Sequence, residues 1–208
     1  MTYEDVPSGT RFQGPNGEWF IYSISTRTGD ISLWNSSRVV SNEGSWNPVG
    51  VQRDADPRGV EWTVNVPELT TLPGRVYKVR DGIILGSNFG RGSPEDGDVS
   101  MWCIAVDNFN PEFTELLWSI TLTPPTPIIS VEDVSLEEDL FIVSTKESRV
   151  TYGFRLSSGE ELWGPTPSRH YTDVWGHASG NSWDIILGGY NKVIAGNYGG
   201  TVWCYNAQ

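Results

Sequence analysis

Apolar and polar positions alternate in short runs along most of this chain, and Gly, Pro, Asn and Asp separate one run from the next. The stretch from Glu112 to Thr123 contains neither Gly nor Pro, and its second half alternates between apolar and polar residues. A period of two puts successive side chains on opposite faces of a strand, whereas helices need a period of 3.6. The pattern therefore predicts an all-β fold of short strands and many turns.

Three segments repeat one order, in which a strand, a turn and a returning strand follow each other. Tryptophans recur with this order: Trp62, Trp118 and Trp163 follow one another at intervals of 56 and 45 residues. A four-stranded propeller blade takes about 40–50 residues, and a long polar loop at 88–98 lengthens the first interval. The repeat predicts β-propeller blades, with paired strands at 81–87 and 99–106, 139–145 and 149–156, and 192–196 and 201–206.

The first 60 residues are less regular than the rest. A hairpin is expected from 19–24 and 30–35, and residues 41–59 are rich in Gly, Asn, Pro and Asp, which predicts a long loop. The expected organisation is an irregular N-terminal blade or partial blade at 1–60, followed by blades at 61–208, of which the last is incomplete.

Composition narrows the class of function. The chain holds 10 Trp, 23 Gly and 13 Pro, and its net charge is -12. Nucleic-acid binding needs a basic surface, and the chain provides none. Membrane spans need about 18 consecutive apolar residues, and no such run occurs. The first residues also lack the basic-then-apolar order of a signal peptide.

The two cysteines occupy equivalent places in the repeat. Cys103 and Cys204 each follow a Trp on the third strand of a blade. Equivalent positions in different blades point the same way and are kept apart by the blade between them. We therefore expect two buried free thiols and no disulfide.

Two segments carry a resemblance to a known family. The C-terminal run from Gly196 to Ala207, with its Gly-Gly turn before Thr-Val-Trp-Cys, is similar to the repeat of PQQ-like β-propellers, the quinoprotein alcohol dehydrogenase-like superfamily. The run from Phe154 to Trp163, with Gly four residues before Trp, resembles the same repeat. The resemblance implies that the Trp docks between adjacent blades. The residues expected to serve this structure are Trp62, Trp118, Gly159, Trp163, Gly199, Gly200 and Trp203.

A narrower resemblance, to archaeal surface-type PQQ-like repeat proteins, rests on four short segments: 14–17, 33–37, 62–67 and 162–166. It implies an extracellular or cell-surface protein, and Asn35-Ser36-Ser37 is also an N-glycosylation acceptor pattern. Rings of this family have six to eight blades, whereas three to four are expected here. A partial propeller is therefore predicted, completed by further blades of the same polypeptide or by self-association.

Enzymes of the family hold PQQ with Ca²⁺ or a lanthanide, use an Asp base and usually carry a pair of adjacent cysteines. This chain has no Cys-Cys pair, and no residues match the metal ligands, so neither PQQ nor Ca²⁺ is expected and no catalytic residue is assigned. Three further groups are candidates for chemistry: His170, Asp173 and His177 as transition-metal ligands, Glu95 to Asp98 as a Ca²⁺ site, and Ser179 as a nucleophile. Each is interpreted more simply as part of a loop or a solvated turn.

Tryptophans outside the repeat are the remaining candidates for binding. Exposed aromatic rings in loops can stack on sugars or contact partner proteins. The residues expected to make such contacts are Trp46, Trp175, His177 and Trp183. The expected function is a non-catalytic binding or scaffold module that contacts a protein or a glycan. The alternatives are a fragment of a PQQ- and Ca²⁺-dependent dehydrogenase, or a carbohydrate-binding module that uses the loop tryptophans.

Overall fold

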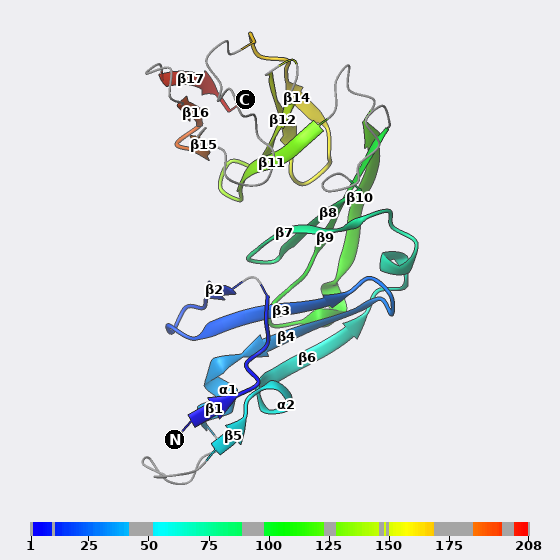
Figure 1. Cartoon of the computed structure of the whole chain (residues 1–208), viewed down its shortest axis with the longest axis vertical. Helices are drawn as coiled ribbons and strands as arrows, with labels where there is room; N and C mark the ends of the chain where they lie inside the picture. Colours follow the sequence, from blue (N-terminus) through cyan, green and yellow to red (C-terminus); the bar gives the residue numbers. More distant parts are fainter. Residues whose placement is uncertain are drawn as a thin grey trace. The chain divides into compact units, whose positions relative to one another are not determined.

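The computed structural model confirms that the protein is all-β, with a few short helical segments (Figure 1). It describes residues 2–9, 11–41, 52–88, 98–122, 128–145, 148, 150–168, 185–196 and 202–207. The helical segments are α1 (Ser36–Ser41), α2 (Asp56–Gly59) and the 3₁₀ turns η1 (Pro67–Thr70) and η2 (Pro111–Phe113).

Strands form within each of the predicted runs, and further strands form at 52–54, 75–80, 128–135 and 185–189, where none was predicted. The described strands are β1 (Thr2–Glu4), β2 (Arg11–Gln13), β3 (Trp19–Ser25), β4 (Asp30–Asn35), β5 (Gln52–Asp54), β6 (Val60–Asn65), β7 (Arg75–Arg80), β8 (Ile83–Ser87), β9 (Val99–Ala105), β10 (Glu115–Leu122), β11 (Ile128–Ser135), β12 (Leu140–Thr145), β13 (Thr151–Arg155), β14 (Glu161–Trp163), β15 (Ile185–Gly189), β16 (Lys192–Gly196) and β17 (Val202–Asn206).

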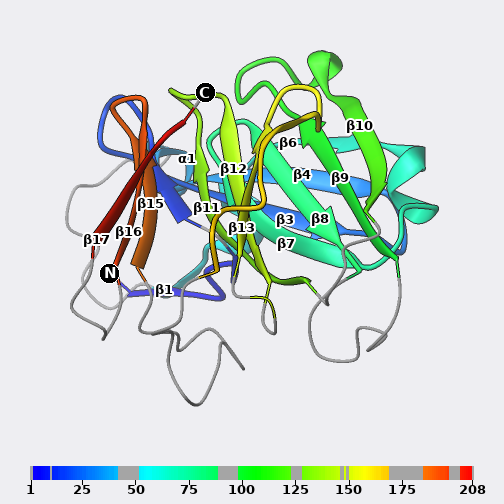
Figure 2. The same cartoon turned by 90° about the horizontal axis from the view of Figure 1, so that it is seen from above.

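Strands that follow one another along the chain lie side by side in the sheets. The orders are β2-β3-β4-β6, β7-β8-β9-β10, β11-β12-β13-β14 and β15-β16-β17, and β1 pairs with β5 in parallel. Figure 2 shows the three-stranded sheet, in which β15, β16 and β17 run next to each other. The first three are four-stranded sheets, which is the number of strands a propeller blade requires.

One turn recurs in three of these sheets, between the first and the second strand. Gly82, Asp139 and Asn191 occupy it with φ of 73°, 50° and 56°. Gly, Asp and Asn are the residues that adopt this left-handed conformation most readily. The carbonyl of each accepts a hydrogen bond from the first residue after the third strand: Val106 N to Gly82 O is 2.8 Å, Leu156 N to Asp139 O is 2.9 Å, and Ala207 N to Asn191 O is 3.1 Å.

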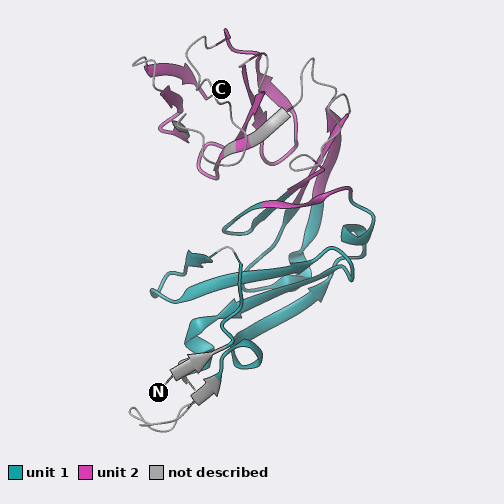
Figure 3. Ribbon diagram, viewed as in Figure 1, with its two compact units in different colours: residues 1–72, 78–85, 104–116 teal, residues 73–77, 86–103, 117–208 magenta. Residues whose placement is uncertain are grey.

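The chain divides into two compact units (Figure 3). Unit 1 comprises residues 1–72, 78–85 and 104–116, and unit 2 comprises residues 73–77, 86–103 and 117–208, so the division runs through the β7–β10 sheet. The domain boundary expected between residues 60 and 61 lies inside β6. Because β6 pairs with β4, one sheet contains residues from both sides of that boundary.

The region expected to be one long loop, 41–59, contains the strand β5 and the helix α2 within its described part. Helix α2 has a proline in its first turn, where the missing N–H is not needed. Trp34 donates its indole N–H to the carbonyl of Ala55 at 2.8 Å, and a side chain at Gly59 would strike the same indole. A small core of Ile21, Trp34, Val39 and Ala55 thus closes one face of the first sheet.

Unit 2 has its own core between two sheets. Leu140 and Ile142 of β12 pack against Val193 and Ala195 of β16, together with Ala207. Each of these side chains is at most 2% exposed. The sheets of unit 2 are therefore held together by ordinary apolar burial, at about 25 cal/mol for each Å² removed from water.

The prediction for the cysteines is half right. Both are free thiols, and Cys103 is fully buried, but Cys204 is exposed. Cys204 shares a face of its sheet with Ile194, its register partner, and with Val202, which are 48% and 71% exposed. Equal positions in the repeat therefore give equal strand geometry, whereas burial depends on what covers each face of the sheet.

Among the described residues, no helix is long and apolar enough to cross a membrane.

Candidate functional site

The tryptophans of the repeat make one kind of contact three times. The indole N–H of Trp62 (β6) donates to Asn108 O at 2.8 Å, that of Trp118 (β10) to Leu156 O at 2.7 Å, and that of Trp163 (β14) to Ala207 O at 3.0 Å. Each donor lies on the last strand of a sheet, and each acceptor lies just after the third strand of the next. A buried indole needs such a partner, and the repeat supplies it with a main-chain carbonyl.

Aromatic rings support these hydrogen bonds. Trp118 stacks on Phe141 with centroids 5.4 Å apart, and Trp163 lies 6.4 Å from Tyr205. Trp118 is 7% exposed, whereas Trp163 is half-buried. The contact of Trp118 is thus the more enclosed of the two.

Gly159 lies directly against Trp118. Its φ is 73°, and a Cβ atom built on it would lie 2.8 Å from Cδ2 of that indole. Both the backbone conformation and the close approach require glycine here. The two residues of the Gly-to-Trp spacing thus make two separate contacts. Gly159 packs against Trp118 of the preceding sheet, and the indole N–H of Trp163 donates to Ala207 of the following sheet.

The other expected structural residues have different environments. Trp203 lies on β17, is half-buried, and packs against the core formed by Leu140, Ile142 and Val193. Gly199 and Gly200 lie outside the described residues. The expected ligand-contact residues lie outside them as well, as do most of the weaker candidates: Trp46, Trp175, His177, Trp183, His170, Asp173, Ser179 and residues 95–97.

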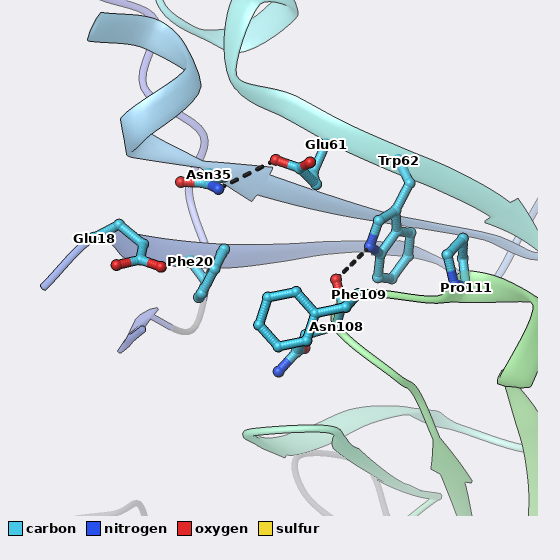
Figure 4. A pocket seen from close by; sticks show the side chains of 8 residues that line it. All are labelled: Glu18, Phe20, Asn35, Glu61, Trp62, Asn108, Phe109 and Pro111. Carbon is cyan, nitrogen blue, oxygen red and sulfur yellow. Dashed lines mark hydrogen bonds between the residues drawn. The ribbon is translucent and has the colours of Figure 1, made fainter. Parts of the chain in front are cut away.

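A cavity in unit 1 adjoins the Trp62 contact, and nothing in the sequence pattern predicted it. Its volume is about 330 Å³, at the lower end of the range for ligand pockets. Figure 4 shows Glu18 and Phe20 on one side, Trp62 on the other, and Phe109 between them. The described residues that line it are Glu18, Phe20, Asn35, Glu61, Trp62, Asn108, Phe109 and Pro111.

The polar groups of this cavity are partly engaged already. Asn35 donates to Glu61 Oε2 at 3.1 Å, and Arg38 donates to Glu61 Oε1 at 3.1 Å. Glu18 Oε2 accepts the backbone N–H of Asn16 at 2.9 Å. The pattern Asn35-Ser36-Ser37 begins α1, where the Asn35 side chain accepts hydrogen bonds from the Ser37 N–H and hydroxyl.

A hydrogen-bond chain fixes Asn108 at the back of the cavity. Tyr22 donates its hydroxyl proton to Asn108 Oδ1, and Asn108 Nδ2 donates to Asp81. Burial, and then the negative charge of Asp81, raise the pKa of Tyr22 well above its usual value, so its hydroxyl stays a donor. These bonds hold Asn108 where its main-chain carbonyl accepts the indole N–H of Trp62. No local motif predicts this role, because Trp62 and Asn108 are 46 residues apart in the sequence.

A second cavity, in unit 2, has about the same volume, 320 Å³. It lies beside Trp163 and Tyr205, and the rest of its lining is Gly164, Pro165, Thr166, Pro167 and Asn206. No charged side chain is among these residues. Of these two cavities, the one in unit 1 therefore combines aromatic rings with charge.

The described residues do not gather a metal site. Among them, no three or more His, Cys, Asp or Glu side chains are placed to hold one ion.

No model of a protein family matches this chain, and no curated protein matches it either. Among solved structures, the chain is similar to the computationally designed Ika4 protein, with a TM-score of 0.41 and 12% identical residues, over 100% of this chain and 98% of that one. At this TM-score the likeness carries no argument about fold or function.

Proposed function

We propose that this chain is a β-propeller repeat module of the PQQ-like kind, which acts as a non-catalytic binding or scaffold domain of an extracellular or surface protein. The observation that carries the proposal is the threefold contact of Trp62, Trp118 and Trp163 with the sheet that follows each. A contact that repeats from sheet to sheet is what a propeller needs, since its blades are radially repeated sheets that must be tied to their neighbours.

Further support comes from the turn at Gly82, Asp139 and Asn191, whose carbonyl bond to the residue after the third strand recurs in three sheets. Repetition at two independent places, the turn and the Trp, favours one repeated unit over several unrelated sheets. The cavity of unit 1 supports a binding role, because it opens beside one of these contacts and carries both charge and aromatic rings.

The architecture is tested by an experimental structure of the chain. Sheets arranged around a common axis, with each Trp against the next sheet, would support the proposal. Two sheets packed face to face as a β-sandwich would overturn the propeller.

The non-catalytic role is tested by adding PQQ with Ca²⁺ to the purified chain. We expect no rise in melting temperature and no alcohol-dependent reduction of an electron-accepting dye. Saturable dye reduction would replace this proposal with a quinone-dependent dehydrogenase. Binding to a glycan array that depends on Trp175 or Trp183 would instead favour a carbohydrate-binding module.

A further inference from the structure

The cavity beside Trp62 has a lining whose chemistry selects one class of ligand. We infer that it binds an organic ammonium group carried on an aliphatic stem, with the carboxylate of Glu18 as its charge partner and the rings of Phe109 and Trp62 against its stem and head. The inference goes beyond the proposed function and does not depend on it, because every lining residue belongs to unit 1.

The charged groups of the cavity are acidic. Two carboxylates, those of Glu18 and Glu61, line the cavity, and among the described residues no lysine, arginine or histidine lines it. Arg38 reaches Glu61 from outside the lining, at 3.1 Å. Among the residues that the structure describes, the Glu18 side chain has the backbone N–H of Asn16 as its one hydrogen-bond partner, through one of its two oxygens. An ionised carboxylate accepts about four hydrogen bonds, so Glu18 retains most of its capacity.

The hydrogen-bond donors of the lining are partly engaged. The single donor of Trp62 is already bound to the carbonyl of Asn108. The amides of Asn35 and Asn108 each donate to a carboxylate, Glu61 and Asp81. Each of these amides keeps one further N–H, but the two carboxylates of the lining disfavour an anion and favour a ligand that brings its own N–H groups.

Aromatic rings also line the cavity. Phe109 is 76% exposed, although a phenylalanine gains by burial, and its ring stands at the cavity between Phe20 and Trp62 (Figure 4). Ring faces attract a cation within about 6 Å, and Trp does so most strongly. A carboxylate combined with aromatic faces is the arrangement that recognises an ammonium group, and the volume of about 330 Å³ admits one on a short stem.

The test follows the Trp62 indole N–H by nuclear magnetic resonance, with the signal assigned from a Trp62→Phe variant. The probes are n-butylammonium, Nα-acetyl-lysine N-methylamide and the uncharged Nα-acetyl-norleucine N-methylamide. We expect both cations to shift the signal saturably, less strongly as salt is added, and the norleucine derivative to leave it unchanged. Tighter binding of the lysine derivative would assign a peptide as the source of the ammonium group, and tighter binding of butylammonium a free amine.

Two variants and two matched controls complete the test. Glu18→Gln and Phe109→Ala should each weaken binding of the cations by about tenfold or more, since a charge-assisted contact is lost in one and a ring face in the other. Glu112→Gln and Phe113→Ala change exposed residues of the adjacent turn η2, outside the lining, and should leave binding unchanged. Equal binding of the norleucine derivative, equal loss in the control variants, or an unmoved Trp62 signal would each overturn the inference.

Discussion

Cys103 and Cys204 occupy equivalent positions in two sheets of this protein, but Cys103 is buried and Cys204 is exposed. Both follow a Trp on the third strand, and both strands lead to the same backbone hydrogen bond, at Val106 and at Ala207. Residues Met101 to Ile104 of β9 are buried without interruption, whereas β17 alternates exposed and half-buried positions. The repeat therefore determines the face of the sheet on which a side chain lies, whereas the burial of the side chain depends on what covers that face.

The largest difference between the two sheets is expected in thiol reactivity. Under native conditions a maleimide should modify Cys204 at least about a hundredfold faster than Cys103, because a buried thiol reacts only after local or global opening. Peptide mass spectrometry after timed labelling measures both rates. Similar rates would show that the β9 thiol is not enclosed, and full denaturation, which should equalise the rates, serves as the control.

The second difference is expected in the docking tryptophans. Trp118→Ala should lower the free energy of unfolding by about 3–5 kcal/mol, since a buried ring and its hydrogen bond to Leu156 are both removed. Trp163→Ala should cost less, about 1–3 kcal/mol, because this ring is only half-buried. Urea unfolding followed by circular dichroism gives both values.

The control for this pair is Trp19→Ala, because the Trp19 ring is 52% exposed. This change should lower the free energy of unfolding by about 0.5–1 kcal/mol. A loss for Trp118→Ala no greater than that for Trp19→Ala would contradict the docking role.

A third prediction concerns the glycine that receives Trp118. Gly159→Ala should destabilise the protein by about 1–3 kcal/mol, because alanine is strained at a φ of 73° and its methyl group would press on the indole. The matched control is Gly189→Ala, where a Cβ atom would meet nothing within 4 Å. Equal melting temperatures for the two variants would argue against a tight approach at Gly159.

A fourth prediction concerns the pH dependence of stability. Burial, and then the charge of Asp139, raise the pKa of the Cys103 thiol from about 9 to about 12. The folded protein keeps this thiol protonated while the unfolded chain loses the proton, so its contribution to stability is complete below pH 9 and falls as pH rises toward 12. Replacing Cys103 by Ala should flatten the fall in melting temperature over that window.

Much of the architecture could be predicted from the sequence because short apolar runs, turn residues and recurring tryptophans are local patterns. The short apolar runs and the turns between them predicted β3, β4, β8, β9, β10, β12, β13, β16 and β17, and the recurrence of Trp62, Trp118 and Trp163 marked the last strand of three sheets. Gly159 and Trp163 could be singled out from their spacing, although their partners, Trp118 and Ala207, lie about 40 residues away along the chain.

What could not be predicted depends on residues far apart in the chain. Asn108 has no motif, and its importance comes from Tyr22, Trp62 and Asp81, which lie on other strands and turns of unit 1. Helix α2 escaped notice because it is four residues long and is stabilised by Trp34. The exposure of Cys204 was missed for a related reason, because sequence equivalence says nothing about the neighbour of a sheet.

The account rests most directly on the claim that three tryptophans are tied to the following sheet through their indole N–H groups. Hydrogen–deuterium exchange of the assigned indole signals measures this claim for each Trp. The account predicts slow exchange for Trp62, Trp118 and Trp163 and fast exchange for Trp19, which is half exposed. Exchange of Trp118 and Trp163 as fast as that of Trp19 would contradict it.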